Sequence, residues 1–220
     1  SVTHELKTPI ASLRVWIETL FDHEIPPEKK PRIRKLMDGD LLRLTELVGN
    51  LLEVARVDAG ILDHHPETVE MAPWLRGVCE AMDHRLGQGQ LGLRLELNPK
   101  AQANIDPKNF ATVIENLLSN AFKYASEPRE TTVTLDTDGS DTLIVVSDRG
   151  HGISSKELPR VFQRFYRAGD EMTRQVPGTG LGLFLCREIV QRHRGEIRAS
   201  SLGAGLGTTF TIRIPAATVG

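Results

Sequence analysis

Residues 106–124 read Asp-Pro-Lys-Asn-Phe-Ala-Thr-Val-Ile-Glu-Asn-Leu-Leu-Ser-Asn-Ala-Phe-Lys-Tyr, and this stretch has the features of a central helix in the larger part of the chain. Asp106 is suited to cap a helix, and Pro107 is tolerated at the first helical position because no backbone hydrogen bond is needed there. Apolar residues recur with helical spacing at positions 110, 113, 114, 117, 118 and 122. The stretch therefore predicts an amphipathic helix with one buried face.

A second face of the same predicted helix is polar. Asn116, Asn120, Lys123 and Tyr124 follow one another at spacings of four, three and one. Two amide oxygens suit a hard, still hydrated cation such as Mg²⁺, a lysine supplies a point charge for phosphate, and a tyrosine can pack on a base. A solvated helix face is the alternative interpretation of this stripe.

The segments around this helix predict an α+β domain over residues 72–217. Leu91, Leu93, Leu95 and Leu97 alternate as in a half-buried strand. Helices are predicted near 74–86 and 181–193, and further strands at 131–137, 142–147, 195–201 and 207–214. Together they form a mixed sheet covered by helices on one face. Residues 149–180 lack periodicity and are too long for an idle connection, so they predict a lid.

Two glycine-containing clusters flank the predicted lid. Asp148-Arg149-Gly150-His151-Gly152 directly follows an apolar strand, where a carboxylate can accept the exocyclic amine of adenine, although a simple turn explains the pattern equally well. Gly178-Thr179-Gly180-Leu181-Gly182 opens a helix, where exposed backbone N–H groups favour phosphate. It is not a P-loop, because no Gly-Lys-Ser/Thr follows.

The N-terminal stretch Ser1-Val2-Thr3-His4-Glu5-Leu6-Lys7-Thr8-Pro9 places an imidazole beside a carboxylate. A histidine exposed on the first turns of a helix can act as a nucleophile, with Glu5 accepting its other ring proton. Pro9 removes a helical hydrogen bond nearby, at a local cost of roughly 3 kcal/mol. A surface histidine at an ordinary helix start is the alternative.

Residues 1–60 predict a helical hairpin. Apolar positions alternate at steps of four and three along both of its helices: Leu6, Ile10, Leu13, Ile17 and Leu20, then Ile33, Leu36, Asp40 (polar), Leu44, Leu47, Leu51 and Val54. Two such seams need further helices to cover them, so a dimeric four-helix bundle is expected, and packing against the C-terminal domain is the alternative. Residues 61–71 are interpreted as a linker.

The composition excludes several classes of partner. A net charge of −2 leaves no electrostatic footprint for nucleic acid or an anionic membrane. Cys79 and Cys186 lie in apolar helical patterns and are expected to be buried thiols in a reducing, cytoplasmic compartment. No apolar run is long enough to span a bilayer. Because the chain starts inside a predicted helix, upstream segments tethering the full-length protein to the inner membrane are expected.

Taken in order, these motifs resemble those of the histidine protein kinases of two-component signalling. The H box corresponds to residues 4–9, the N box to 116–124, the G1 box to 148–152, the F box to Phe162-Gln163-Arg164-Phe165-Tyr166 and the G2 box to 178–182. The resemblance covers nearly the whole chain. It implies a dimerisation and phosphotransfer hairpin followed by an α/β-sandwich ATP-binding domain of the Bergerat type, shared with gyrase and the heat-shock chaperone ATPases.

The resemblance also implies roles for individual residues. It makes His4 the phospho-acceptor with Glu5 as its polarising partner, and Thr8 a residue that orients water to dephosphorylate the response regulator, with a helix-stabilising threonine as the alternative. In the ATP site it implies these contacts: Asn116 and Asn120 with Mg²⁺, Lys123 with phosphate, Tyr124 with the nucleoside, Asp148 with the adenine amine, and Thr208 behind the adenine. Gly150 and Gly152 would let the backbone approach the ligand, and Gly178 to Gly182 would lie at the phosphates.

The expected activity is ATP-dependent autophosphorylation of His4 in a homodimer, followed by transfer to an aspartate of a response-regulator receiver domain. The related ATPases carry a water-activating glutamate where this chain has Asn116, and an amide cannot act as a base. Glu115 is about 100° away around the helix. Direct ATP hydrolysis and a non-enzymatic ATP-binding scaffold remain the two alternatives.

Overall fold

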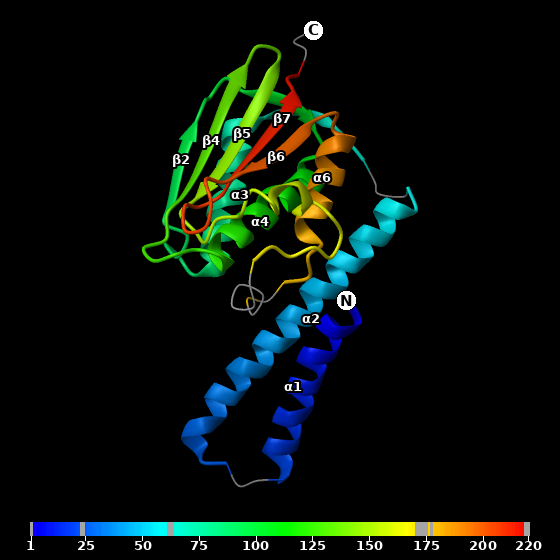
Figure 1. Ribbon diagram of the computed structural model, residues 1–220, viewed down its shortest axis with the longest axis vertical. Helices are drawn as coiled ribbons and strands as arrows, with labels where there is room; N and C mark the ends of the chain where they lie inside the picture. Colours follow the sequence, from blue (N-terminus) through cyan, green and yellow to red (C-terminus); the bar gives the residue numbers. More distant parts are fainter. Residues whose placement is uncertain (1, 23–24, 61–63, 170–175, 177, 218–220) are drawn as a thin grey trace.

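The computed structural model describes residues 2–22, 25–60, 64–169, 176 and 178–217, and it consists of a helical hairpin and an α/β domain (Figure 1). Side chains at positions 2–5, 22, 42, 43 and 46 are outside the described set. The hairpin is made of α1 (Val2–Asp22) and α2 (Lys30–Asp58), joined through the 3₁₀ turn η1 (Pro27–Lys29). The predicted α+β class is therefore confirmed.

The two hairpin helices are held in register by a polar chain inside their seam. Ser12 Oγ donates to Asp40 Oδ2 at 2.6 Å and accepts from Trp16 Nε1 at 3.1 Å. A polar pair in an otherwise apolar seam selects one register, because a shift by one turn leaves its members unpaired. This pairing explains why a carboxylate occupies an apolar position of the repeat. α1 also continues through Pro9, which is buried.

Much of the apolar seam is uncovered in the single chain. Ile33, Leu47 and Val54 are buried. Large apolar residues that remain exposed on the hairpin are Ile10, Val15, Ile17, Leu20, Phe21, Leu36, Leu41, Val48 and Leu52. Among the described residues, Leu51, Val54 and Val57 near the C-terminal end of α2 pack on the second domain, so the alternative of intramolecular packing accounts for that end of the helix.

The second domain is a five-stranded sheet covered on one face by helices (Figure 1). The strand order is β2 (Leu93–Leu97), β4 (Thr131–Asp138), β5 (Asp141–Asp148), β7 (Thr209–Pro215) and β6 (Glu196–Ser200). β2 and β4 are parallel, and the other neighbours are antiparallel. The covering helices are α3 (Met71–Leu86), α4 (Pro107–Lys123) and α6 (Gly182–Arg192), and their apolar faces share one core with the sheet.

The predicted linker needs one correction. Residues 67–70 form a strand, β1 (Glu67–Glu70), which pairs antiparallel with β3 (Gln102–Ile105), and α3 begins at Met71. Neither strand was predicted, because each has four residues and β1 has a single apolar one, Val69. Backbone pairing with a distant segment, which periodicity does not reveal, decides such strands. Residues 61–63 lie outside the described residues.

The predicted lid is irregular apart from the 3₁₀ turn η2 (Leu158–Arg160), and its residues 170–175 and 177 lie outside the described set. Both cysteines are free and buried, as predicted, and burial raises the pKa of the Cys79 thiol to about 12. Within the described residues, none of the helices has the length and hydrophobicity that crossing a membrane requires.

Candidate nucleotide site

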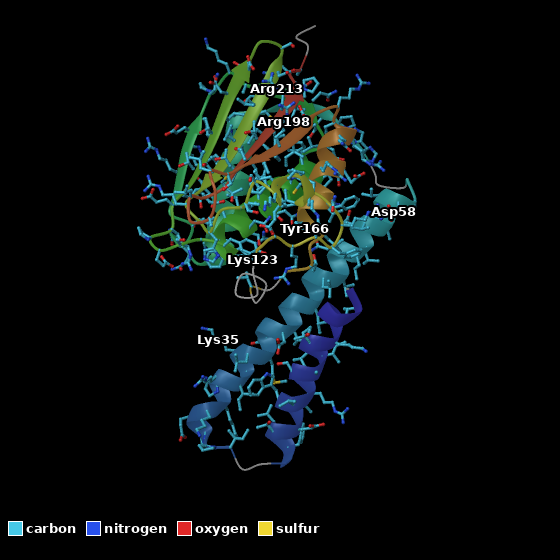
Figure 2. All side chains as sticks on the ribbon, viewed as in Figure 1. Lys35, Asp58, Lys123, Tyr166, Arg198 and Arg213 are labelled. Carbon is cyan, nitrogen blue, oxygen red and sulfur yellow. The ribbon has the colours of Figure 1, made fainter. Side chains whose placement is uncertain are left out.

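A cavity of about 1230 Å³ lies between α2 and the second domain. Pockets for single small molecules usually measure about 300–1000 Å³, and this one is larger because it includes the gap between hairpin and domain. Figure 2 shows Lys123 and Tyr166 at the end of the domain nearest the hairpin, with Lys35 on α2. All three residues line the cavity, so both parts of the chain contribute to its wall.

The polar stripe of α4 forms one wall of this cavity. Asn116, Asn120, Lys123 and Tyr124 all line it, which places the four residues together as expected. Asn116 Nδ2 donates to the backbone oxygen of Thr112 at 2.9 Å. Because the amide nitrogen is held by the helix, the carbonyl oxygen Oδ1 is left as the available ligand atom.

Gly182, the first residue of α6, faces Asn116 at close range. A Cβ at position 182 would lie 2.7 Å from Asn116 Oδ1. We therefore expect Gly182→Ala to displace the Asn116 side chain and to weaken by roughly tenfold the binding of ATP with Mg²⁺ that the family resemblance implies here, measured by calorimetry. Gly77→Ala is the matched control, since a Cβ on this α3 glycine meets no atom within 4 Å. Equal affinities of the two variants would contradict the assignment.

Asp148, at the end of β5, is a half-buried carboxylate with one oxygen already used. Its Oδ1 accepts from Gly150 N at 2.8 Å and from Thr208 N at 3.2 Å. Among the described residues, Oδ2 has no hydrogen-bond partner and is left for a ligand in the cavity. Burial raises the pKa of Asp148, although the two N–H groups oppose this shift.

Of the residues predicted near Asp148, two line the cavity and one holds Asp148 in place. Gly152 and Thr208 line the cavity, whereas Gly150 is buried outside the lining and acts on the site by its bond to Asp148. Gly152 has φ +67°, and a Cβ there would lie 2.0 Å from Gly203 O. Only glycine fits that close approach.

The glycine-rich segment before α6 is divided in the same way. Gly178, Thr179, Gly180 and Gly182 line the cavity. The side chain of Leu181 does not. It is fully buried in a separate apolar cluster with Val54 of α2 and with Phe184 and Leu185 of α6.

The H-box residues lie on the first turns of α1, and the N-terminus lies at the end of the hairpin nearest the second domain (Figure 1). The side chains of His4 and Glu5 lie outside the described residues. Thr8 is exposed and does not line the cavity.

Glu157, which organises part of the lid, was not predicted from the sequence. Glu157 accepts from Ser154 Oγ at 2.7 Å, from Gly169 N at 2.8 Å and from Tyr166 Oη at 3.3 Å. Glu157, Tyr166 and Arg167 also line the cavity. The Ser-x-x-Glu spacing of residues 154–157 is a capping-box pattern and was the available signal.

The F-box aromatics behave differently from each other. Phe162 packs on Phe210 with ring centroids 6.4 Å apart, and it is partly buried against the core of the domain. Phe165 is 45% exposed and has φ +62°. It therefore does not anchor the lid through a buried side chain.

An ion pair and a neighbouring apolar cluster join the second domain to α2. Arg164 of the F box donates through both terminal nitrogens to the carboxylate of Asp58, with Nη1 and Oδ2 2.8 Å apart, and its guanidinium lies over the Phe184 ring at 4.3 Å. The hydrogen bond from Arg164 lowers the pKa of Asp58. Exposed ion pairs contribute little, so the neighbouring burial of Val54 supplies most of the stabilisation.

Comparisons with known proteins agree with this arrangement. Residues 105–218 match the model of the histidine kinase-, DNA gyrase B- and HSP90-like ATPases, and residues 1–60 match that of the His Kinase A phospho-acceptor domain. Sensor protein SrrB of Staphylococcus aureus is 36% identical over 98% of this chain. The chain spans only 37% of that relative's length.

Solved structures share the fold. The histidine kinase AdeS of Acinetobacter baumannii has a TM-score of 0.76 at 24% identity, covering 96% of this chain and 97% of that one. Histidine kinase ThkA, solved in complex with the response regulator protein TrrA, has a TM-score of 0.77 at 20% identity, covering 98% of this chain and 60% of that one. With a phospho-acceptor hairpin and an ATPase-type domain in one polypeptide, the chain belongs to the sensor histidine kinases of two-component systems.

Proposed function

We propose that this chain transfers the γ-phosphoryl group of ATP to a ring nitrogen of His4 and then to an aspartate of a response-regulator receiver domain. The observation that carries the proposal is the shared cavity, whose walls come from the α4 stripe and from the hairpin. A nucleotide bound along α4 would lie in a cavity that is also lined by α2, the helix that packs against the His4-bearing helix α1.

The residues of the cavity fit a nucleotide with a divalent cation. Asn116 offers an oriented amide oxygen, Asn120 lies one turn further along α4, and neutral amides leave water on Mg²⁺, which that ion prefers. When bound, Mg²⁺ would neutralise phosphate charge. Lys123 would hold a phosphate, Tyr124 the nucleoside and Asp148 the adenine amine.

In the proposed step the imidazole nitrogen of His4 bonds to the γ-phosphorus while the bond from that phosphorus to the β,γ-bridging oxygen breaks, and ADP leaves. Glu5 would polarise the ring by accepting the proton of the other nitrogen. Positioning and charge neutralisation supply most of the catalysis in such transfers. Exposed Thr8, one turn after His4, would orient water when the phosphorylated regulator is dephosphorylated.

Two features of α4 favour transfer to histidine over ATP hydrolysis. Asn116 cannot take a proton from water. Glu115 does not line the cavity, and its carboxylate lies 3.3 Å from Arg85 of α3. Incubation with γ-labelled ATP should therefore put acid-labile, base-stable label on the protein. Steady phosphate release with no labelled protein would favour the ATPase alternative, and nucleotide binding with neither product would favour a scaffold.

We infer that the exposed apolar positions of the hairpin pair with a second copy of the chain. Ile10 and Ile17 are 54% and 47% exposed and lie two turns apart on α1. The double change Ile10→Lys and Ile17→Lys should shift the protein from dimer to monomer in light scattering, because two charges cannot be buried in that seam. Arg34→Ala, at an exposed charged position of α2, is the control and should stay dimeric. A dimer in both proteins would contradict the proposed interface.

The proposed substrates place the chain in the cytoplasm, where ATP and receiver domains are found. The buried free thiols agree with that reducing compartment.

A further inference from the structure

His193, at the end of α6, is a buried histidine that the proposed phosphoryl transfer does not use. Only 6% of the residue is exposed. Its ring lies 5.2 Å from the Phe110 ring of α4 and 4.6 Å from the ring of His64, and both contacts are edge-on. His64 belongs to the segment that connects the hairpin to the second domain. His193 therefore sits where α6, α4 and this connection meet.

The hydrogen bonds of His193 fix its protonation state. Asp106 N donates to Nε2 at 2.9 Å, and Nδ1 lies 2.7 Å from the backbone oxygen of Ile189. Since Nε2 accepts a hydrogen bond, the ring proton is on Nδ1, which donates to Ile189. Both nitrogens are satisfied in this neutral form. A proton on Nε2 would point at the Asp106 N–H and break that bond.

Asp106 joins this histidine to the connection and to the nucleotide helix. Its Oδ1 accepts from Lys108 N and Asn109 N at 3.1 and 3.0 Å, which caps α4. Its Oδ2 accepts from Asn109 Nδ2 and from His65 N, both at 2.9 Å. The connection is thus bonded to the residue that caps the helix carrying Asn116 and Asn120.

We propose that neutral His193 is a positioning residue: with Asp106 it holds His64 and His65 against the start of α4, and its protonation releases them. We call these four residues the linker anchor. Because the anchor binds the connection at His64 and His65, only the residues between the end of α2 and His64 remain as a tether between hairpin and domain. The anchor thereby limits the positions that the hairpin can take relative to the nucleotide site. The effect of the anchor on the rate of His4 phosphorylation rests on the proposed kinase function, whereas the anchor itself does not.

The pKa shifts of His193 and Asp106 are consistent with release of His64 and His65 at acidic pH. Burial lowers the pKa of His193; the hydrogen bond to Ile189 and the carboxylate of Asp106 oppose this, and His64 adds to it. Burial acts to raise the pKa of Asp106, but the N–H groups of Asn109, His65 and Lys108 outweigh it and lower the pKa. Asp106 therefore stays ionised while His193 titrates. Because the folded-state pKa of His193 is depressed, the stability it provides is complete above about pH 6.5 and is lost as the pH falls through the folded pKa.

The first test needs no nucleotide. Amide exchange of His65 and Asp106, corrected for the intrinsic rate, should speed up by at least about tenfold between about pH 7.5 and about pH 5.5 in the wild type. His84→Gln, at an exposed histidine of α3, should behave like the wild type, and His193→Gln should lose the pH dependence. Unchanged protection in the wild type, or the same pH dependence in His193→Gln, would overturn the proposal.

A second test avoids the core. His65→Pro removes the backbone N–H that donates a hydrogen bond to Asp106, whereas His65→Ala keeps it. A longer free tether should lower the maximal rate of His4 phosphorylation in His65→Pro by roughly three- to tenfold, with the affinity for ATP unchanged. His65→Ala should match the wild type. Equal rates in the two variants would refute the positioning role, and absence of labelling in the wild type would refute the kinase function and leave the exchange test intact.

Discussion

Replacing His4 by glutamine is expected to abolish ATP-dependent labelling of the chain. Glutamine keeps a polar side chain on α1 but has no ring nitrogen that can attack phosphorus, so the rate should fall by more than about a thousandfold. The measurement is the amount of acid-labile phosphate on the protein after incubation with γ-labelled ATP.

The binding of nucleotide provides the control for this variant. His4 is on the hairpin helix α1, whereas the proposed nucleotide contacts are on the second domain, so the affinity of His4→Gln for MgATP should equal that of the wild type. The same amount of acid-labile label on His4→Gln would place the acceptor elsewhere. Loss of nucleotide binding would show that the variant is misfolded.

Replacing Asp148 by asparagine should weaken ATP binding by roughly 10- to 100-fold. Oδ1 is held by the N–H groups of Gly150 and Thr208, so the asparagine oxygen is expected to take that place. Its NH₂ group would then face the cavity, where the adenine amine is also a donor. Guanine presents a carbonyl there, so GTP should lose less affinity than ATP, and calorimetry with both nucleotides separates this effect from general damage. An unchanged affinity for ATP would remove Asp148 from the site.

The raised pKa of Asp148 gives this contact a pH dependence. The ionised form accepts the amine, and in the free protein the carboxyl becomes protonated as the pH falls toward its raised pKa. ATP affinity in the wild type should therefore fall toward acid pH. The ATP phosphates titrate as well, so the affinity ratio of wild type to Asp148→Asn is the quantity to measure, and this ratio should shrink in acid.

Local sequence patterns predicted most of the elements. The predicted start of α4 at Asp106-Pro107 is confirmed, because the Asp106 carboxylate accepts hydrogen bonds from two backbone N–H groups of the first turn. Capping depends on residues within one turn, so the sequence is enough to predict it. The predicted strands 131–137 and 142–147 are present as β4 and β5, and the turn between them has Gly139 at φ +64°. The spacing along α4 also placed Asn116 and Asn120 on one wall, since helical periodicity alone puts them there.

Patterns failed where a contact joins segments that are distant in sequence. The predicted role of Leu181 concerned its backbone near phosphate, and no pattern indicated that its side chain packs with Val54 of α2, more than a hundred residues away in the chain. The role of Asp106 beyond its helix was likewise hidden, because His65 and His193 reach it from two remote segments.

Local patterns in the sequence were enough for most of the elements and for the polar stripe of α4, because capping, periodicity and glycine chemistry act over a few residues; the acceptor role of His4 stays a prediction. The tertiary structure alone decided that α2 forms a wall of the nucleotide cavity, that Arg164 of the lid binds Asp58, and that a neutral His193 fastens the connection to α4. Each of these depends on how the hairpin and the sheet domain pack together, and packing energies are summed over side chains that no local pattern brings together.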